Sequence, residues 1–205
     1  MIFNCLITGV GGQGTVLVSR LIGDAAIAKG LDVRGSETIG MAQRGGSVVS
    51  HIRIGENIHS PLIPTGKANI IIAFEPAEAV RVIHFLAPGG RMIVLDRGVM
   101  PVSSSLGKTP YKPAEMISYL KAEFSRPKED QVAQAGDEDR LIIISGDELV
   151  KKCGDPKVLN TALLGIALEK KFFPFSAADM LDVLKKRTPA KYLEINMKAL
   201  GLGRS

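Results

Sequence analysis

The sequence predicts an α/β fold in which a mixed, mostly parallel sheet lies between two layers of helices. Short runs rich in Val and Ile alternate with longer segments of helical periodicity, as in parallel strands joined by helices. The first apolar run ends in clustered glycines that open a helix, which is a Rossmann-like start. Residues 47–60 alternate around Gly55-Glu56-Asn57, which predicts an antiparallel hairpin. We therefore expect a three-layer αβα sandwich with one antiparallel hairpin.

The N-terminal half supplies most of the predicted strands. Apolar residues between positions 16 and 26 recur at helical spacing, and Gly30 is a typical stop for that helix. Pro76 suits the first turn of the next helix, where Glu75 and Glu78 favour the positive end of its dipole. Strands are expected at residues 2–8, 31–34, 47–54, 58–60, 67–74 and 91–95, helices at 14–29 and 76–86, and a loop at 35–46.

The C-terminal third is predicted to be helical. Residues 97–111 are rich in Ser, Gly and Pro, and residues 125–140 are charged without an apolar period, so both are expected to be loops. No linker or internal repeat divides the chain, and one domain over residues 1–205 is expected. The remaining predicted elements are a helix at 113–124, a last strand at 141–144 and helices at 147–152, 156–171, 176–187 and 189–199.

Composition narrows the classes of function. The chain has 205 residues, of which 45% are hydrophobic, which is enough for one substantial core. The net charge of +5 is dispersed and lacks the basic stripe with interleaved aromatic residues that binds nucleic acid. No apolar run is long enough to span a bilayer, and the first apolar segment lacks the basic start of a signal peptide. We expect a cytoplasmic protein that binds neither nucleic acid nor membrane.

Metal sites and catalytic residues are not expected. Cys5 and Cys153 are far apart, whereas an iron–sulfur cluster needs about four thiolates. His51, His59 and His84 lack the spacing of a structural zinc site. No arrangement of side chains suggests nucleophilic or general acid–base catalysis, so no catalytic residue is assigned.

The turn Gly9-Val10-Gly11-Gly12-Gln13-Gly14-Thr15 is the main candidate site. Its glycines leave amide groups uncovered at a helix N-terminus, where anions bind. A P-loop would need Lys where Thr15 stands. A Rossmann dehydrogenase would need an acid near Arg34 and a regular βαβ repeat beyond it. The glycines also fit a purely structural role in helix–strand packing and a subunit contact, and this alternative stays open.

A second glycine loop, Gly40-Met41-Ala42-Gln43-Arg44-Gly45-Gly46-Ser47, follows the first. Together they resemble the loops of the gamma domain of the 2-oxoacid:ferredoxin oxidoreductases. The second loop is most similar to the form found in the beta subunit of the indolepyruvate branch of that family. Further similarity lies in residues 160–165 and 191–200, and it is weakest in residues 100–140.

The resemblance implies a subunit of an enzyme rather than a complete one. The implied reaction is CoA-dependent oxidative decarboxylation of a 2-oxoacid, of the indolepyruvate or arylpyruvate type, with ferredoxin as electron acceptor. Thiamine diphosphate and the iron–sulfur clusters would sit on a larger partner subunit, so the isolated chain would be inactive.

The resemblance also implies where coenzyme A would be contacted. Arg44 could pair with an anionic group, but an exposed Arg in a glycine loop equally suits a subunit interface. The alternative from another class of function is a stand-alone nucleotide-binding or regulatory module without redox chemistry, which would have no cysteine-rich partner. The candidate cofactor-binding residues are Gly9, Gly11, Gly12, Gln13, Gly14, Thr15, Arg44, Gly45 and Gly46.

Overall fold

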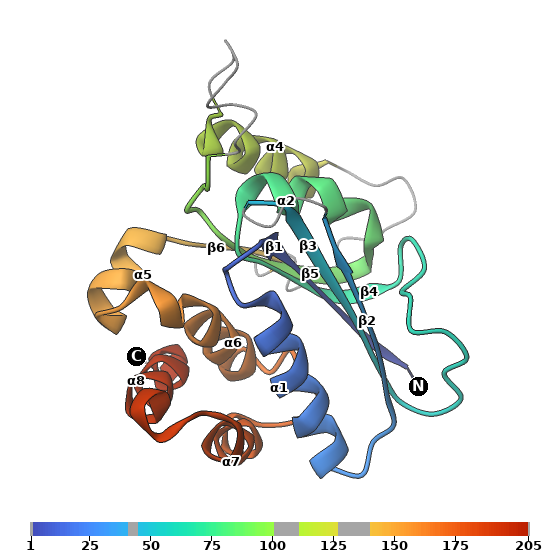
Figure 1. Cartoon of the computed structure of the whole chain (residues 1–205). Coiled ribbons are helices and arrows are strands. Elements are labelled where there is room, and N and C mark those ends of the chain that lie inside the picture. The colour runs from blue at the N-terminus through green and yellow to red at the C-terminus, as the bar shows by residue number, and fades with distance from the viewer. Residues whose placement is uncertain (1, 41–44, 101–110, 127–139, 205) are drawn as a thin grey trace.

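A computed structural model describes residues 2–40, 45–100, 111–126 and 140–204 (Figure 1). In these residues a six-stranded sheet has the order β2-β3-β1-β4-β5-β6. Strands β1, β4, β5 and β6 are parallel, whereas β3 runs antiparallel to both β1 and β2. The strands are β1 (Phe3–Val10), β2 (Val33–Ile39), β3 (Ser47–Ile54), β4 (Ala68–Ala73), β5 (Leu86–Leu95) and β6 (Leu141–Ile144).

Helices cover both faces of this sheet, which confirms the predicted αβα sandwich (Figure 1). One layer contains α2 (Pro76–Val82) and α4 (Pro113–Ser125), with the 3₁₀ turn η1 (Ile83–Phe85) between α2 and β5. The other layer contains α1 (Thr15–Ala28), α5 (Gly146–Cys153), η3 (Pro156–Val158), α6 (Leu159–Glu169), α7 (Ala177–Arg187), α8 (Ala190–Gly201) and η4 (Leu202–Arg204).

Two apolar cores lie on either side of the sheet because alternate residues of a strand point to opposite faces. In β1, Cys5 and Ile7 pack with the α1 layer, whereas Leu6 packs with the α2 layer. In β4, Ile70 and Ile71 divide in the same way. Central strands that are buried on both faces read as continuous apolar runs, which explains why β1 and β4 were predicted correctly.

The predicted hairpin was wrong in its second strand. Residues 58–60 form no strand, and β3 instead pairs antiparallel with β2, which precedes it. Strand β2 extends to Ile39 through residues that were expected to be a loop. This strand lies at the edge of the sheet and is largely exposed, so it tolerates Gly and charged residues that carry no apolar alternation.

The other predicted elements agree with the structure to within a few residues, apart from β5. This strand begins at Leu86 rather than Arg91, because the Pro88-Gly89-Gly90 segment is accommodated by an irregularity in its pairing with β4. Helix α2 ends at Val82 and continues as the 3₁₀ turn η1. The predicted loops 97–111 and 125–140 lie largely outside the described residues.

Candidate functional site

The first glycine turn joins the end of β1 to the start of α1. Gly12 and Gly14 have φ values of 96° and 79°, in the left-handed region that favours glycine. Gly14 is the N-cap of α1, and no side chain caps this helix end. The positive end of the helix dipole is therefore available to an anion.

Gln13 braces this turn. Its Oε1 accepts a hydrogen bond from the Val10 backbone at 2.8 Å, and its Nε2 donates to the Phe74 carbonyl at 3.0 Å. The side chain thus ties the end of β1 to the end of β4. A Cβ added at Gly9 would lie 2.6 Å from Gln13 Oε1 and 3.1 Å from the methyl group of buried Thr15. Gly9, Gln13 and Thr15 therefore shape the turn rather than presenting free groups.

The second glycine loop lies against the first. The Gly11 amide donates to the Gly46 carbonyl at 2.8 Å, and the Gly40 amide donates to the Ser47 carbonyl at the base of the loop. Gly45 adopts a positive φ of 72°. The structure thus brings together the two predicted loops, while Arg44 lies outside the described residues.

A pocket of about 280 Å³ opens beside Gly12 at the carboxyl ends of β1, β4 and β5. Ligands of open α/β sheets bind at this edge, where the chain connections diverge to opposite sides. Its ionisable lining groups are two exposed cations, Arg97 after β5 and Lys157 in η3. The described lining residues are Gly12, Gln13, Phe74, Leu95, Arg97, Val99, Pro156, Lys157, Leu159 and Asn160, and they include no carboxylate.

Asn160 links this pocket to the start of α1. The side chain is only 5% exposed and lies near the beginning of α6, against Gly14. Its Oδ1 accepts from the Thr161 backbone at 2.7 Å, whereas no described residue accepts a hydrogen bond from its Nδ2. A side-chain amide nitrogen carries two N–H donors, which can serve a ligand or water where no protein group accepts from them. Asn160 Nδ2, the uncapped helix end and the two cations together favour an anionic ligand.

Two buried carboxylates hold the start of β3 next to the second loop. The Ser47 hydroxyl donates to Glu78 Oε2 at 2.5 Å, and Arg81 Nε lies 3.3 Å from Glu78 Oε1. Glu75 caps α2 by accepting from the Glu78 backbone at 3.0 Å and also accepts from the Tyr111 hydroxyl. Burial and the hydrogen bond to Glu75 raise the pKa of Tyr111. This network fixes where the second loop ends.

Comparison with known proteins assigns the chain to a family. The model of the family described as "Pyruvate ferredoxin/flavodoxin oxidoreductase" matches residues 4–205. The chain belongs to this oxidoreductase family. This outcome favours the predicted oxidoreductase subunit over a stand-alone nucleotide-binding or regulatory module.

The curated relatives of this oxidoreductase chain match it along almost its whole length. A protein of Pyrococcus horikoshii named "Indolepyruvate oxidoreductase subunit IorB" is 34% identical over 201 residues, which cover 98% of this chain and 94% of the relative. The protein of the same name from Archaeoglobus fulgidus is 34% identical over 204 residues, which cover 99% and 94%. The expected resemblance is therefore confirmed.

Solved structures share the fold of this oxidoreductase chain. The gamma subunit of a keto/oxoacid ferredoxin oxidoreductase from Geobacter sulfurreducens aligns with a TM-score of 0.63 and 18% identity, covering 98% of this chain and 95% of that one. A 2-oxoglutarate:ferredoxin oxidoreductase from Magnetococcus marinus, with 2-oxoglutarate, coenzyme A and succinyl-CoA bound, aligns with a TM-score of 0.64 and 16% identity. That alignment covers 99% of this chain and 30% of the other.

Sequence reasoning missed three pocket residues of the oxidoreductase chain, namely Arg97, Lys157 and Asn160. No local motif marks them, although Arg97 follows a predicted strand and Asn160 lies in a segment of family resemblance. In the described residues, no three His, Cys, Asp or Glu side chains are placed to hold a metal ion. Both cysteines are buried, and burial raises the pKa of each thiol.

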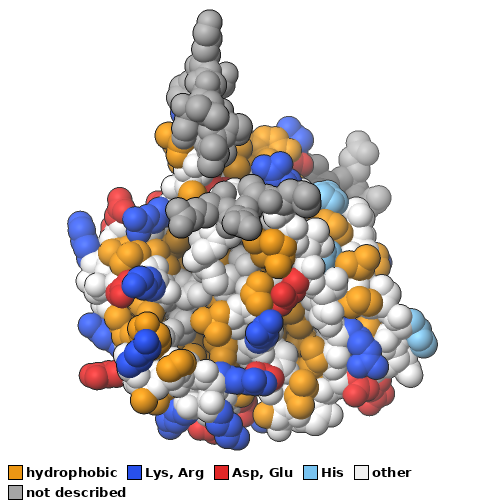
Figure 2. Space-filling model, in the orientation of Figure 1, with side chains coloured by type: hydrophobic (Ala, Val, Ile, Leu, Met, Phe, Trp, Pro, Cys, Tyr) orange, Lys and Arg blue, Asp and Glu red, His pale blue; other side chains and the backbone are white. Residues whose placement is uncertain are grey.

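Lys and Arg side chains are scattered among acidic and apolar ones on the face shown in Figure 2, rather than gathered in one stripe. Within the described ranges, no helix has both the length and the hydropathy needed to cross a membrane.

Proposed function

We propose that this chain is the non-cluster-binding subunit of a cytoplasmic 2-oxoacid:ferredoxin oxidoreductase that acts on indolepyruvate or another arylpyruvate. The observation that carries the reaction is the 34% identity to subunits named for indolepyruvate oxidoreductase over 98% of this chain. We also propose that residues 1–205 form one gamma-type domain and that a larger subunit carries thiamine diphosphate and the iron–sulfur clusters. Ferredoxin would interact with the complete complex.

The proposed reaction is an oxidative decarboxylation. The bond between the carboxylate and the keto carbon breaks to release CO₂, and the acyl carbon forms a thioester with the sulfur of coenzyme A. Two electrons pass to two oxidised ferredoxins, and the thiol proton is released. Thiamine diphosphate on the partner would supply the chemistry of decarboxylation, and the residues of this chain would bind and orient coenzyme A.

The pocket beside Gly12 supports a role in holding an anionic group of coenzyme A. An anion at the start of α1 would gain about 0.3–1 kcal/mol from the helix dipole, or up to about 2 kcal/mol if partly buried. Arg97 and Lys157 are exposed, so each would add a charge-assisted contact worth about 1–1.5 kcal/mol. Asn160 Nδ2 would donate to the same group.

The two glycine loops have different roles in the proposed site. Gly11, Gly12 and Gly14 let the backbone approach the ligand, and Gly45 and Gly46 belong to the adjoining loop. Arg44 supplies either a further anion contact or a contact to the larger subunit. Gly9, Gln13 and Thr15 keep the turn in shape.

The pocket is tested in the complex reconstituted from this chain and its partner subunit. Lys157→Met should raise the KM for coenzyme A about tenfold, which corresponds to about 1.4 kcal/mol, and leave the KM for the oxoacid unchanged. Lys151→Met, an exposed substitution on α5, serves as the matched control. Equal effects on both substrates would contradict coenzyme binding in this pocket.

Arg44→Ala separates the two roles of the second loop. A coenzyme contact predicts a rise of about tenfold in the KM for coenzyme A with an intact complex. An interface contact predicts weaker association in size-exclusion chromatography with normal kinetics in the complex that still forms. A complex that is intact and kinetically normal would reject both roles.

The subunit assignment itself has a direct test. The isolated chain should be colourless and should not reduce a viologen dye with indolepyruvate and coenzyme A, and the larger subunit should restore turnover. Robust turnover by the isolated chain would overturn the assignment.

A further inference from the structure

Strand β2 forms an edge of the sheet, with β3 on one side and no described strand on the other (Figure 1). The Gly55 amide donates to the Asp32 carbonyl before β2, and the Gly40 amide donates to the Ser47 carbonyl after it. Because hydrogen-bonded pairs alternate along an antiparallel ladder, the even-numbered residues of β2 bond to β3. The backbone groups of the odd-numbered residues face outward, and these residues are Val33, Gly35, Glu37 and Ile39.

The side chains of the odd-numbered residues lie on the α1 face of the sheet. Val33 packs against Gly23 of α1, with its Cγ1 3.7 Å from the position of an added Cβ. Glu37 Oε1 accepts from the Ser19 hydroxyl, also in α1, at 3.1 Å. Alternation along the strand places Ile39 on the same face, where its side chain is 64% exposed.

A groove of about 380 Å³ runs between α1 and β2. Val33 and Gly35 line it from β2, and Ile27 lines it from α1 with 61% of its side chain exposed. No other large apolar side chain in the described ranges is as exposed as Ile27 and Ile39. Helix α1 packs more extensively over β3 than over β2, so the groove is open toward the edge of the sheet.

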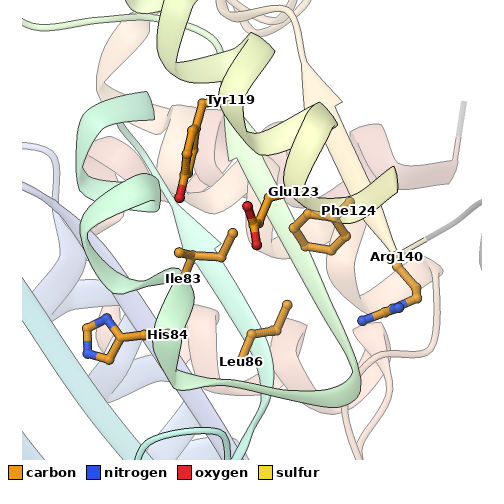
Figure 3. A pocket seen from close by; sticks show the side chains of 7 residues that line it. All are labelled: Ile83, His84, Leu86, Tyr119, Glu123, Phe124 and Arg140. Carbon is orange, nitrogen blue, oxygen red and sulfur yellow. The ribbon is translucent and has the colours of Figure 1, made fainter. Parts of the chain in front are cut away.

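The cavity between α4 and η1, of about 390 Å³, lies in the opposite helical layer (Figure 3). Its charged side chains already have partners within the chain. Glu123 pairs with Arg126 at 2.8 Å, and Arg140 Nε donates to the Gly90 carbonyl at 3.4 Å. Unused hydrogen-bonding groups are found instead along the outer edge of β2.

We propose that β2 pairs antiparallel with β2 of a second copy of this chain, about a two-fold axis at Ser36. Val33 then lies opposite Ile39 of the second copy, and Gly35 lies opposite its Glu37. Each of these pairs joins two outward-facing residues, so both backbone hydrogen bonds of the pair form. The six-stranded sheets of the two copies become one continuous sheet.

The pattern of outward-facing residues selects this register. A shift by one residue would set the side chains of paired residues on opposite faces. A shift by two residues in one direction would place the two Glu37 side chains directly opposite each other, and like charges in that position are destabilising. The same shift in the other direction would leave Ile39 opposite a residue that precedes β2. Only the register about Ser36 pairs all four outward-facing residues.

The charged side chains of β2 permit this pairing. Arg34 lies on the other face, opposite Thr38 of the second copy. In the single chain the exposed Arg34 Nη1 donates to the Val33 carbonyl at 3.2 Å, and the amide of Ile39 in the second copy replaces that donor. The Glu37 carboxylate stays turned toward α1 of its own chain.

The pairing also covers the exposed apolar side chains. Ile39 of the second copy enters the groove beside Ile27 and Val33, and the symmetry repeats this contact. The two α1 helices, each over its own β3, are three strand spacings apart, or roughly 14 Å. Directly packed helices are about 8–10 Å apart, so the groove has room for these side chains.

Disulfide cross-linking of the full chain tests the register. Residues on the two-fold axis form a non-hydrogen-bonded pair with about 4.5 Å between Cα atoms, which is close enough for a disulfide. Ser36→Cys should therefore give a disulfide-linked dimer with oxidised glutathione, seen on a non-reducing gel. Thr38→Cys is the matched control, because its two copies would be roughly 13 Å apart. Both native cysteines are buried. Equal cross-linking of the two variants, or none in Ser36→Cys, would overturn the proposal.

Size-exclusion chromatography with light scattering tests the apolar contact. The full chain should have the mass of two chains, and Ile39→Lys should weaken self-association about tenfold or more. Met100→Lys, a 55%-exposed position after β5, should leave self-association unchanged. A monomeric unaltered chain at high micromolar concentration, or equal effects of the two variants, would overturn the proposal. So would a chain that is monomeric alone and in which Ile39→Lys weakens association with the larger subunit, because β2 would then bind that subunit.

Discussion

Asn160 Nδ2 occupies the space that a side chain on Gly14 would need. The start of α6 thereby packs against Gly14, the N-cap residue of α1. Glycine is required here for two independent reasons, because Gly14 also has a left-handed φ of 79°. The two reasons can be separated by mutation.

Gly14→Ala should lower the free energy of unfolding by more than the roughly 1–2 kcal/mol that the left-handed conformation costs. The excess comes from the overlap with Asn160, so Asn160→Ala should recover part of it in the double variant. Gly30→Ala is the matched control, since Gly30 has a φ of 75° but nothing within 4 Å of an added Cβ. Urea denaturation measures all three, and equal losses for Gly14→Ala and Gly30→Ala would rule out the overlap.

Gln13→Glu should destabilise the chain by about 1–3 kcal/mol, although the two side chains have the same shape. The carboxylate keeps the acceptor for the Val10 amide but loses the donor to the Phe74 carbonyl and faces its oxygen. Denaturant titration at neutral pH gives the difference. An unchanged midpoint would mean that Gln13 does not brace the turn.

The hydrogen bond between Ser47 and Glu78 should show strong coupling. A double-mutant cycle with Ser47→Ala and Glu78→Ala should give roughly 1.5–3 kcal/mol, because the bond joins a hydroxyl to a buried carboxylate. Arg81→Met should cost less than about 1 kcal/mol, since the Arg81 side chain is 64% exposed. Additive effects of the first pair would contradict the role given to this network.

His51 should make stability depend on pH near neutrality. Burial lowers the pKa of His51, whose Nδ1 accepts from the Ile63 amide at 3.2 Å. The unfolded chain takes up a proton near pH 6.5 and the folded chain does so only at lower pH, so stability falls as pH drops below about 6.5. His51→Asn keeps an acceptor and should reduce this slope between pH 7.5 and 5.5.

The control for this pH series is His59→Asn, at an exposed position. Free energies of unfolding from urea titrations at each pH give the slopes. If the His51→Asn slope equals that of the unaltered chain, the titration of His51 does not contribute.

Sequence patterns predicted the elements whose structure is determined by their own residues. Buried strands such as β4 and the glycine turn before α1 carry their own signals, namely a continuous apolar run and a fixed spacing. The edge strand β2 carries none, because its exposed residues need no apolar alternation. The strand at residues 58–60 was predicted from a local hairpin pattern. In the structure β3 pairs instead with β1 and β2.

The candidate site shows the same division. The two loops were recognisable as glycine-rich segments, but their contact through Gly11 and Gly46 depends on the direction of β3. Arg97, Lys157 and Asn160 come from β5, η3 and α6, which meet only because of the strand order. The spacing of these three residues in the sequence does not predict that they line one pocket.

The position of β3 between β1 and β2 has a consequence for the order of events during synthesis. Strands β1 and β2 run in the same direction with a helix between them, so a nascent chain that ends before residue 47 can pair them directly as an ordinary βαβ unit. Strand β3 must then separate that pair before it can insert. We therefore expect a slow phase in refolding, in which a β1–β2 pair separates to admit β3, and single-phase fast refolding would contradict this expectation.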